Sequence, residues 1–424
     1  MSFSQRVVFL LLVACLLAGV ITGNNLYYRL AYLWIFLIVS SWIMSRLALR
    51  GLQFKRTARS LRAQVGQIFE ERFEIYNASR VPRLWLEVRD ESPLPGARAS
   101  QVLSSIAGRE SRTFLVRTRL LQRGVFPLGE TVLASSDLFG LFPVSRVHPA
   151  EDAVLVYPML VEVNAFPSPM GWLSGGEALR RRTHQITANA AGVREYAPGD
   201  PLNRIHWLST ARRNRLIVKE FELDPLAEVW IFVDASRYVH STLAQADVSM
   251  EERDMWRPSV KIPLPPSTEE YAVSIAASLA RFFLQRGRAV GLVYAGHYFS
   301  VLSAERGGRQ LGKILETLAL LHAEGKMPLQ SLVDTQVRSL PRGSTIILIT
   351  PSIGNEVLLS AELLSRRGMR PVAVLLEAHT FGGSSGTGRI ATNLELMGIP
   401  VCRVAYGDDL TTTLSEAARS QVWV

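Results

Sequence analysis

The chain has 424 residues, of which 48% are hydrophobic and 20% are charged, a composition typical of folded protein. This length exceeds one ordinary core, so we expect two or three domains. Lys and Arg outnumber Asp and Glu by 47 to 37, and the net charge of +10 favours an acidic partner such as an anionic membrane or nucleic acid. Only two cysteines are present, which excludes a disulfide framework and a cysteine-based zinc site.

Two uncharged apolar runs, residues 7–22 and 30–44, stand near the N-terminus. Each is somewhat shorter than the ~20 residues that span a bilayer core, but flanking Tyr and Trp side chains extend them as interfacial anchors. The tight connection at Gly23, Asn24 and Asn25 predicts a helical hairpin. A cleaved signal peptide followed by a buried helix is the alternative, which the immediate second run and the missing small-x-small cleavage site disfavour.

Basic residues follow the second apolar run and predict its orientation. Six Arg or Lys residues lie between positions 46 and 62, and no acidic residue comes before Glu70. By the positive-inside rule this side is cytoplasmic, so we expect a two-span protein of the cell (inner or plasma) membrane with both termini in the cytoplasm. The same cluster accounts for much of the basic excess, which makes nucleic acid an unlikely partner.

Three further segments follow the predicted hairpin of residues 1–50. Residues 51–160 show short alternating runs separated by turn residues, a pattern typical of a sandwich-like β-domain. Residues 161–227 contain a strand–helix–strand segment. In residues 228–424 buried-strand runs alternate with amphipathic helices, which predicts a doubly wound α/β domain with a mainly parallel sheet covered on both faces.

The strand–helix–strand segment (residues 192–222) holds the densest group of charged residues. We expect a strand, a turn, a helix capped by Asp200 with Pro201 at its first position, and a returning strand. Its charged side chains form a candidate surface for a protein partner, or they pair with one another and fix the turn. A catalytic role is disfavoured because no nucleophile–base pair is evident. The candidate partner-binding residues are Arg194, Glu195, Tyr196, Asp200, Arg204, His206, Trp207, Arg212 and Arg213.

A candidate metal site follows the first strand of the α/β domain. Ligands of such sheets bind at the carboxyl ends of the strands, where Asp234 and Ser236 stand, and Thr350 ends a later strand. A carboxylate and hydroxyls are suitable ligands for Mg²⁺, but two oxygens are too few without further donors. The later strand end, residues 349–352, supplies hydroxyls and no carboxylate. The alternative is a structural aspartate at a strand end.

An insertion, residues 244–267, separates this first strand from its helix. It contains Trp256 and four prolines. It is a solvated loop or a flap that contacts a partner, and the sequence leaves both open.

Several motifs together resemble the bacterial family called domain of unknown function 58. They are R-E-Y-A-P-G-D-P-L-N-R-I-H-W (194–207), V-K-E-F-E (218–222), D-A-S (234–236), S-D-L-F-G-L-F (136–142) and V-Y-P (156–158). The resemblance implies two membrane helices, a β-rich region and a von Willebrand factor A-like (vWA-like) α/β domain. It also implies a MoxR-type AAA+ ATPase as partner and, often, a membrane protein with a transglutaminase-like domain.

The metal motif of vWA domains, D-x-S-x-S with a later Thr and Asp, maps only in part onto this chain. Asp234 and Ser236 match it, whereas Tyr238 stands in place of the second serine and Pro351 follows Thr350 where an aspartate is common. We therefore expect a degenerate site, with no cofactor unless Mg²⁺ binds there.

From these features we expect a membrane-anchored, non-catalytic interaction and assembly module rather than an enzyme. The alternative is a Mg²⁺-dependent hydrolase or phosphoryl-transfer enzyme centred on Asp234, which requires a further carboxylate near Ser236.

Overall fold

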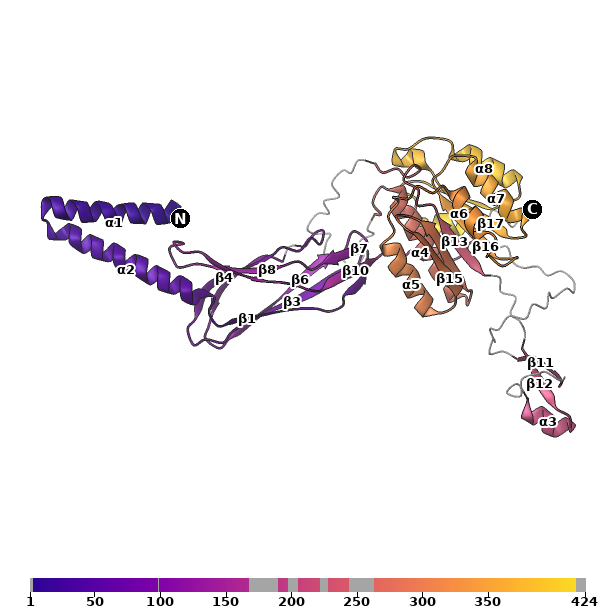
Figure 1. Cartoon of the computed structure of the whole chain (residues 1–424), viewed down its shortest axis with the longest axis horizontal. Coiled ribbons are helices and arrows are strands. Elements are labelled where there is room, and N and C mark those ends of the chain that lie inside the picture. The colour runs from indigo at the N-terminus through magenta and orange to yellow at the C-terminus, as the bar shows by residue number, and fades with distance from the viewer. Residues whose placement is uncertain are drawn as a thin grey trace. The chain divides into compact units, whose positions relative to one another are not determined.

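The structure is a computed structural model that describes residues 3–97, 99–167, 190–196, 205–221, 228–243 and 263–416 (Figure 1). Two compact units are distinguished, one made mainly of Met1–Leu160 and the other mainly of the chain that follows.

The chain begins with two apolar helices, α1 (Phe3–Thr22) and α2 (Asn25–Ala48). Gly23 adopts a positive φ of 65°, and the Asn24 side chain caps α2 by accepting the Leu26 N–H at 2.9 Å. The 20-residue and 24-residue helices are longer than their uncharged runs, because the polar flanks are helical too. Both are long and apolar enough to cross a membrane, as the sequence predicts.

A β-rich region follows the helices, in agreement with the sequence. Its strands are β1 (Leu52–Ala58), β2 (Arg62–Gln64), β3 (Ile68–Asn77), β4 (Arg83–Asp90), β5 (Gln101–Ile106), β6 (Ser111–Arg119), β7 (Gly124–Pro127), β8 (Thr131–Ser135), β9 (Val144–His148) and β10 (Ala153–Tyr157). They form sheets of order β1-β3-β6, β5-β4-β8-β9 and β2-β10-β7. Every second residue of β3 is buried, and Phe73 and Ile75 pack with Leu86 and Val88 of β4, so two sheets share one core.

Arg56 joins strands of two sheets through a buried ionic cluster. Its guanidinium donates from Nε to Glu71 on β3 at 2.7 Å and from Nη1 to Asp90 on β4 at 3.0 Å. The side chains are 8%, 1% and 1% exposed, so these charges depend on one another rather than on water. Burial raises the pKa of Asp90 to about 6, and the neighbouring Glu71 charge adds to this while Arg56 opposes it.

Replacement of Asp90 tests this cluster. Because its pKa is raised from 3.8 to about 6, the folded protein holds a proton that the unfolded chain releases in this window. Stability should fall as the pH rises through it, by at most about 3 kcal/mol. We expect Asp90→Asn to flatten this dependence in thermal unfolding of the full chain, and Glu91→Gln, at an exposed neighbour, to leave it unchanged. The same dependence of stability on pH in Asp90→Asn and in the wild type would contradict the raised pKa of Asp90.

The C-terminal region is an α/β domain, as the sequence predicts. Its elements are β13 (Val229–Val233), α4 (Thr268–Gln285), β14 (Val290–Ala295), β15 (Phe299–Glu305), α5 (Gly308–Ala319), α6 (Leu329–Gln336), β16 (Thr345–Thr350), α7 (Glu356–Arg366), β17 (Arg370–Leu376), a 3-10 turn (Ala378–Phe381), α8 (Thr387–Leu396), β18 (Val401–Val404) and α9 (Leu410–Glu416). The sheet order is β15-β14-β13-β16-β17-β18, and only the edge strand β15 pairs antiparallel among these strands.

Helices cover both faces of this sheet. Trp230 and Phe232 of β13 share a buried cluster with residues of α6, α7 and α8, while α4 packs against β13, β14, β16 and β17. All five residues of β13 and all six of β16 are buried, which explains why these strands read as uninterrupted apolar runs.

Candidate functional site

The α/β sheet has its switch point between β13 and β16. From β13 the chain first adds β14 on one side and later adds β16 on the other, and β13 pairs parallel with both. The connections after these two strands run in opposite directions. Sheets of this kind bind ligands at the carboxyl ends of the two strands where this happens. Asp234 follows β13 and Thr350 ends β16, so the structure brings together two side chains that lie far apart in the sequence.

Asp234 is buried, with 2% of its surface exposed, and its carboxylate is satisfied by protein donors. The Thr350 hydroxyl donates to Oδ2 at 2.7 Å, and the Ser236 backbone N–H donates to Oδ1 at 3.1 Å. Burial raises the pKa of Asp234, and these two hydrogen bonds oppose that shift. Ser236, the third predicted ligand, is also buried, and it contacts the carboxylate through its backbone N–H.

His240 fixes the loop after Asp234. Its Nε2 lies 2.7 Å from the Asp234 carbonyl oxygen and its Nδ1 lies 3.0 Å from the Thr268 hydroxyl at the start of α4. Because a carbonyl oxygen only accepts, the ring donates from Nε2. This residue carried no signal in the sequence, since it reaches the backbone of Asp234 rather than its side chain.

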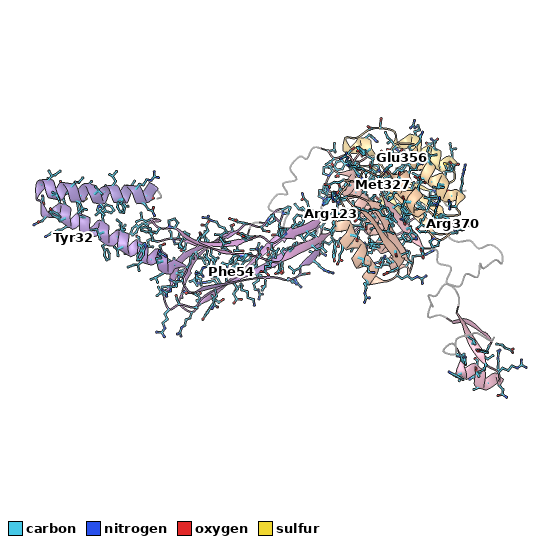
Figure 2. All side chains as sticks on the ribbon, in the orientation of Figure 1. Tyr32, Phe54, Arg123, Met327, Glu356 and Arg370 are labelled. Atoms are coloured by element: carbon cyan, nitrogen blue, oxygen red, sulfur yellow. The ribbon has the colours of Figure 1, made fainter. Side chains whose placement is uncertain are left out.

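A second carboxylate, Glu356, lies at the same end of the sheet (labelled in Figure 2). The Ser352 hydroxyl donates to it at 2.5 Å, and the Ser352 N–H donates to the Thr350 hydroxyl at 2.9 Å. A Cβ on Gly354 would lie 1.9 Å from a Glu356 carboxylate oxygen, so this glycine leaves the space that the side chain occupies. The strand end therefore has a carboxylate that we did not expect, because the first residue of α7 reaches back over the loop.

Asp234, Thr350, Ser352 and Glu356 form the switch-point cluster. Its oxygens are of the type that hard cations prefer. The Thr350 and Ser352 hydroxyl protons, however, point at the two carboxylates, so the cluster is closed by its own hydrogen bonds. A cation would have to turn both protons away. Among the described residues, no group of three or more His, Cys, Asp or Glu side chains is placed to hold a metal ion.

Two residues depart from the vWA metal motif, Tyr238 in the loop after β13 and Pro351 directly after β16. Tyr238 is 68% exposed and stacks with the Arg237 guanidinium 4.8 Å from its ring centroid. Pro351 is buried after β16. An exposed aromatic side chain therefore stands four residues after Asp234 in the loop that leaves β13.

The strand–helix–strand segment differs from its predicted form. An antiparallel pair, β11 (Ala190–Glu195) and β12 (Ile217–Phe221), flanks a short helix α3 (Trp207–Arg213). Helix α3 begins at Trp207, where His206 caps it and accepts the Ser209 N–H at 3.3 Å. The predicted cap Asp200 and the predicted first helical residue Pro201 lie outside the described residues. Ile205, which would lie within a helix that starts at Pro201, instead forms a β-bridge with Val218.

The predicted partner-binding residues are only partly described. Asp200, Arg204, the side chain of Arg194 and residues 244–262 of the predicted flap lie outside the described residues. Glu195 forms an exposed ion pair with Arg215 at 2.9 Å, and Tyr196 is half-buried. No residue of α3 is buried, and its exposed residues Trp207, Leu208, Arg212 and Arg213 are called the α3 face below.

Removal of the Thr350 hydroxyl tests the role of the switch-point cluster. In Thr350→Val the buried Asp234 carboxylate loses its side-chain donor, which should cost about 1–3 kcal/mol. Thr350→Ser keeps the hydroxyl and should lose markedly less. We expect urea unfolding of the full chain to give a lower free energy of unfolding for Thr350→Val than for Thr350→Ser. Equal free energies would show that this hydrogen bond does not stabilise the fold.

A comparison with known families matches the part of the chain that contains the strand–helix–strand segment and Asp234. A sequence model of the family described as "Protein of unknown function DUF58" matches residues 192–247. The "Uncharacterized protein YeaD" of Bacillus subtilis (strain 168) is 22% identical over 260 residues, which cover 60% of this chain and 57% of that protein. The match thus spans little more than half the length of this curated relative.

Solved structures share only remote similarity with the chain. The CARDB domain of the PF1109 protein from Pyrococcus furiosus is 12% identical, covering 25% of this chain and 91% of that one, with a TM-score of 0.18. The GH20 exo beta-N-acetylglucosaminidase from Vibrio harveyi is 9% identical, covering 82% of this chain and 60% of that one, with a TM-score of 0.17. Scores this low carry no argument about fold or function.

Proposed function

We propose a function on the premise that this chain belongs to the DUF58 family of proteins of unknown function. The chain acts as a membrane-anchored, non-catalytic interaction and assembly module. Its α/β domain serves as a vWA-like domain that binds a MoxR-type AAA+ ATPase. A transglutaminase-like membrane protein is a further candidate partner.

The observation that carries this proposal is the closed switch-point cluster. Asp234 lies where this class of sheet binds its ligands, yet both of its carboxylate oxygens accept hydrogen bonds from the protein. A buried carboxylate satisfied in this way holds two strand ends together and shapes the surrounding loops. Binding would then use the exposed rim, where Tyr238 lies, rather than the cluster itself.

Membrane anchoring rests on α1 and α2. Both helices are apolar and largely uncovered by the rest of the chain, as Phe36, 74% exposed on α2, illustrates. The basic residues after α2 favour a cytoplasmic position for the domains that follow, with both termini on that side of the cell membrane.

The α3 face is the proposed second contact with the partner. It combines exposed Trp and Leu side chains with two arginines, the residue types that interfaces use as apolar anchors and as partners for carboxylates. Its exposed position within the strand–helix–strand segment makes it a suitable site for an acidic surface of an ATPase.

Charge reversal on α3 tests this contact. We expect Arg212→Glu combined with Arg213→Glu to lower recovery of an AAA+ ATPase on the tagged full-length protein, after crosslinking in its native membrane, by about tenfold for each 1.4 kcal/mol lost. The matched control reverses the adjacent exposed pair Arg366 and Arg367 at the end of α7. Equal recovery with both double variants would place the interface elsewhere, and no ATPase with the wild type would refute the proposal.

A Mg²⁺-dependent hydrolase or phosphoryl-transfer enzyme centred on Asp234 is the second candidate. Glu356 favours it, because its charge is felt at Asp234 and it supplies the second carboxylate that such chemistry requires. Calorimetric titration of the full-length protein with Mg²⁺ separates the two candidates. Mg²⁺ binding that is lost in Glu356→Gln, together with Mg²⁺-dependent turnover by the wild type, would favour the enzyme. The absence of any heat of Mg²⁺ binding would favour the interaction module.

A further inference from the structure

The loop between β8 and β9, residues 136–143, exposes two large apolar side chains next to the membrane helices. Leu138 is 63% exposed and Phe139 is 58% exposed, whereas Leu141 in the same loop is buried at 3%. Adjacent exposed Leu and Phe side chains at a loop tip are costly in water and indicate a contact surface.

The loop is held in one shape by Asp137, which is 1% exposed. One carboxylate oxygen accepts the Phe139 N–H at 3.0 Å, and the other accepts the Phe142 N–H at 2.7 Å. Gly140 adopts a positive φ of 66° and donates its N–H to the Asp137 carbonyl at 3.1 Å. The exposure of the two apolar side chains is therefore a property of an ordered turn.

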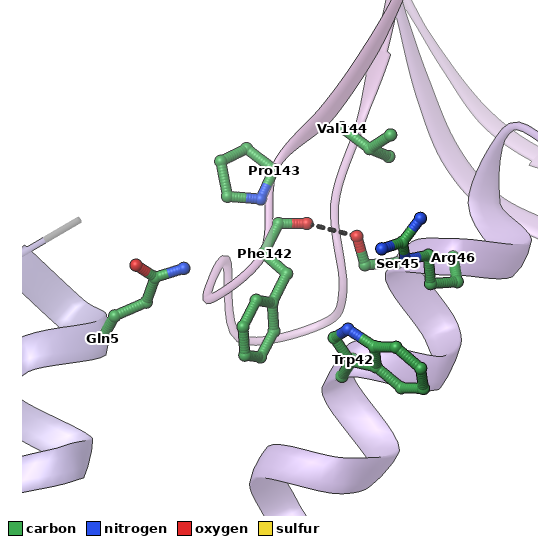
Figure 3. Close-up of a pocket in the computed structure, with 7 residues that line it drawn as sticks. All are labelled: Gln5, Trp42, Ser45, Arg46, Phe142, Pro143 and Val144. Carbon is green, nitrogen blue, oxygen red and sulfur yellow. Dashed lines mark hydrogen bonds between the residues drawn. The ribbon is translucent and has the colours of Figure 1, made fainter. Parts of the chain in front are cut away.

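Hydrogen bonds attach this loop to both membrane helices, and Figure 3 shows the one from Ser45. The Ser45 hydroxyl of α2 donates to the Phe142 carbonyl at 2.6 Å, and the Gln5 side chain of α1 donates to the Leu141 carbonyl at 2.5 Å. Figure 3 shows Phe142 between Gln5 of α1 and Trp42 of α2. The loop thus lies between the first residues of α1 and the last turns of α2.

The length of α2 places this contact at the edge of a bilayer. At about 1.5 Å per residue, about 30 Å of helix separates Asn25 from Ser45, which is about the thickness of a hydrocarbon core. Trp42 and Arg46 stand at this level, with the guanidinium 5.6 Å from the indole centroid, an arrangement suited to an interface with anionic head groups.

We propose that the loop of residues 136–143 is a lipid-contacting element, in which Leu138 and Phe139 enter the cytoplasmic leaflet beside the end of α2. The inference rests on the proposed membrane anchoring of α1 and α2. Apolar side chains at such a boundary enter the membrane by about 5–10 Å. Together with the bonds to Gln5 and Ser45, this contact fixes how the β-rich domain meets the bilayer surface.

Site-specific fluorescence tests the proposal on the full chain in lipid nanodiscs with phosphatidylglycerol. Phe139→Cys is labelled with an environment-sensitive dye in a Cys15→Ser background. Cys402 stays unlabelled because it is 2% exposed and burial raises its pKa to about 12. The matched controls are Phe36→Cys within α2 and the half-exposed Val125→Cys on β7, at the other end of the β-rich domain (Figure 1).

We expect a lipid nitroxide near the head group to quench the loop label more than a nitroxide near the acyl-chain end. Iodide should quench the loop label less than it quenches the label on β7. Strong iodide quenching without nitroxide quenching would overturn the proposal, provided that the label on α2 is quenched by the deep nitroxide. Protection of the loop label from both quenchers would indicate a protein contact and would also overturn it. Iodide quenching of the α2 label would instead refute the membrane anchoring.

Discussion

The hydrogen bond from Thr350 to Asp234 is the interaction on which the α/β domain depends at its switch point. A carboxylate that is 2% exposed must be paired with donors or give up its charge, and this one receives a hydroxyl and a backbone N–H. The same bond joins the ends of two neighbouring parallel strands that are separated by more than half of the domain. Both carboxylate oxygens are therefore used within the protein, and the proposed recognition would use exposed groups such as Tyr238.

Buried aspartates organise the β-rich region by the same principle. Asp90 shares the Arg56 guanidinium with Glu71 and so ties strands of two sheets together. Asp137 accepts two backbone N–H groups and closes the loop that touches both apolar helices. Each carboxylate fixes the backbone or strand geometry around it, and this geometry decides which neighbouring apolar side chains are exposed and which are buried. The proposed role as a membrane-anchored interaction module would need this kind of rigidity.

Much of the fold could be predicted from the sequence, because the apolar runs and their periods report burial directly. They indicated the two helices and the parallel sheet. The candidate metal site grouped Asp234 with Thr350, and the structure joins these two residues by a hydrogen bond instead. Glu356 could not be predicted, since its place depends on how α7 starts and on the space left by Gly354. The capping of α3 by His206 could not be predicted either, because aspartate at position 200 is the stronger capping signal in the sequence. The vWA-like character of the sheet and its partner remain proposals.

The central claim is that a protein partner binds at the rim of the switch point. The most direct measurement places a photo-crosslinking amino acid at Tyr238, which is 68% exposed, in the full-length protein in its native membrane. Leu396 on α8, 81% exposed, provides the matched position away from the rim. The account predicts a light-dependent adduct with an AAA+ ATPase from Tyr238 and none from Leu396. An equal adduct from both positions, or no protein adduct from Tyr238, would contradict it.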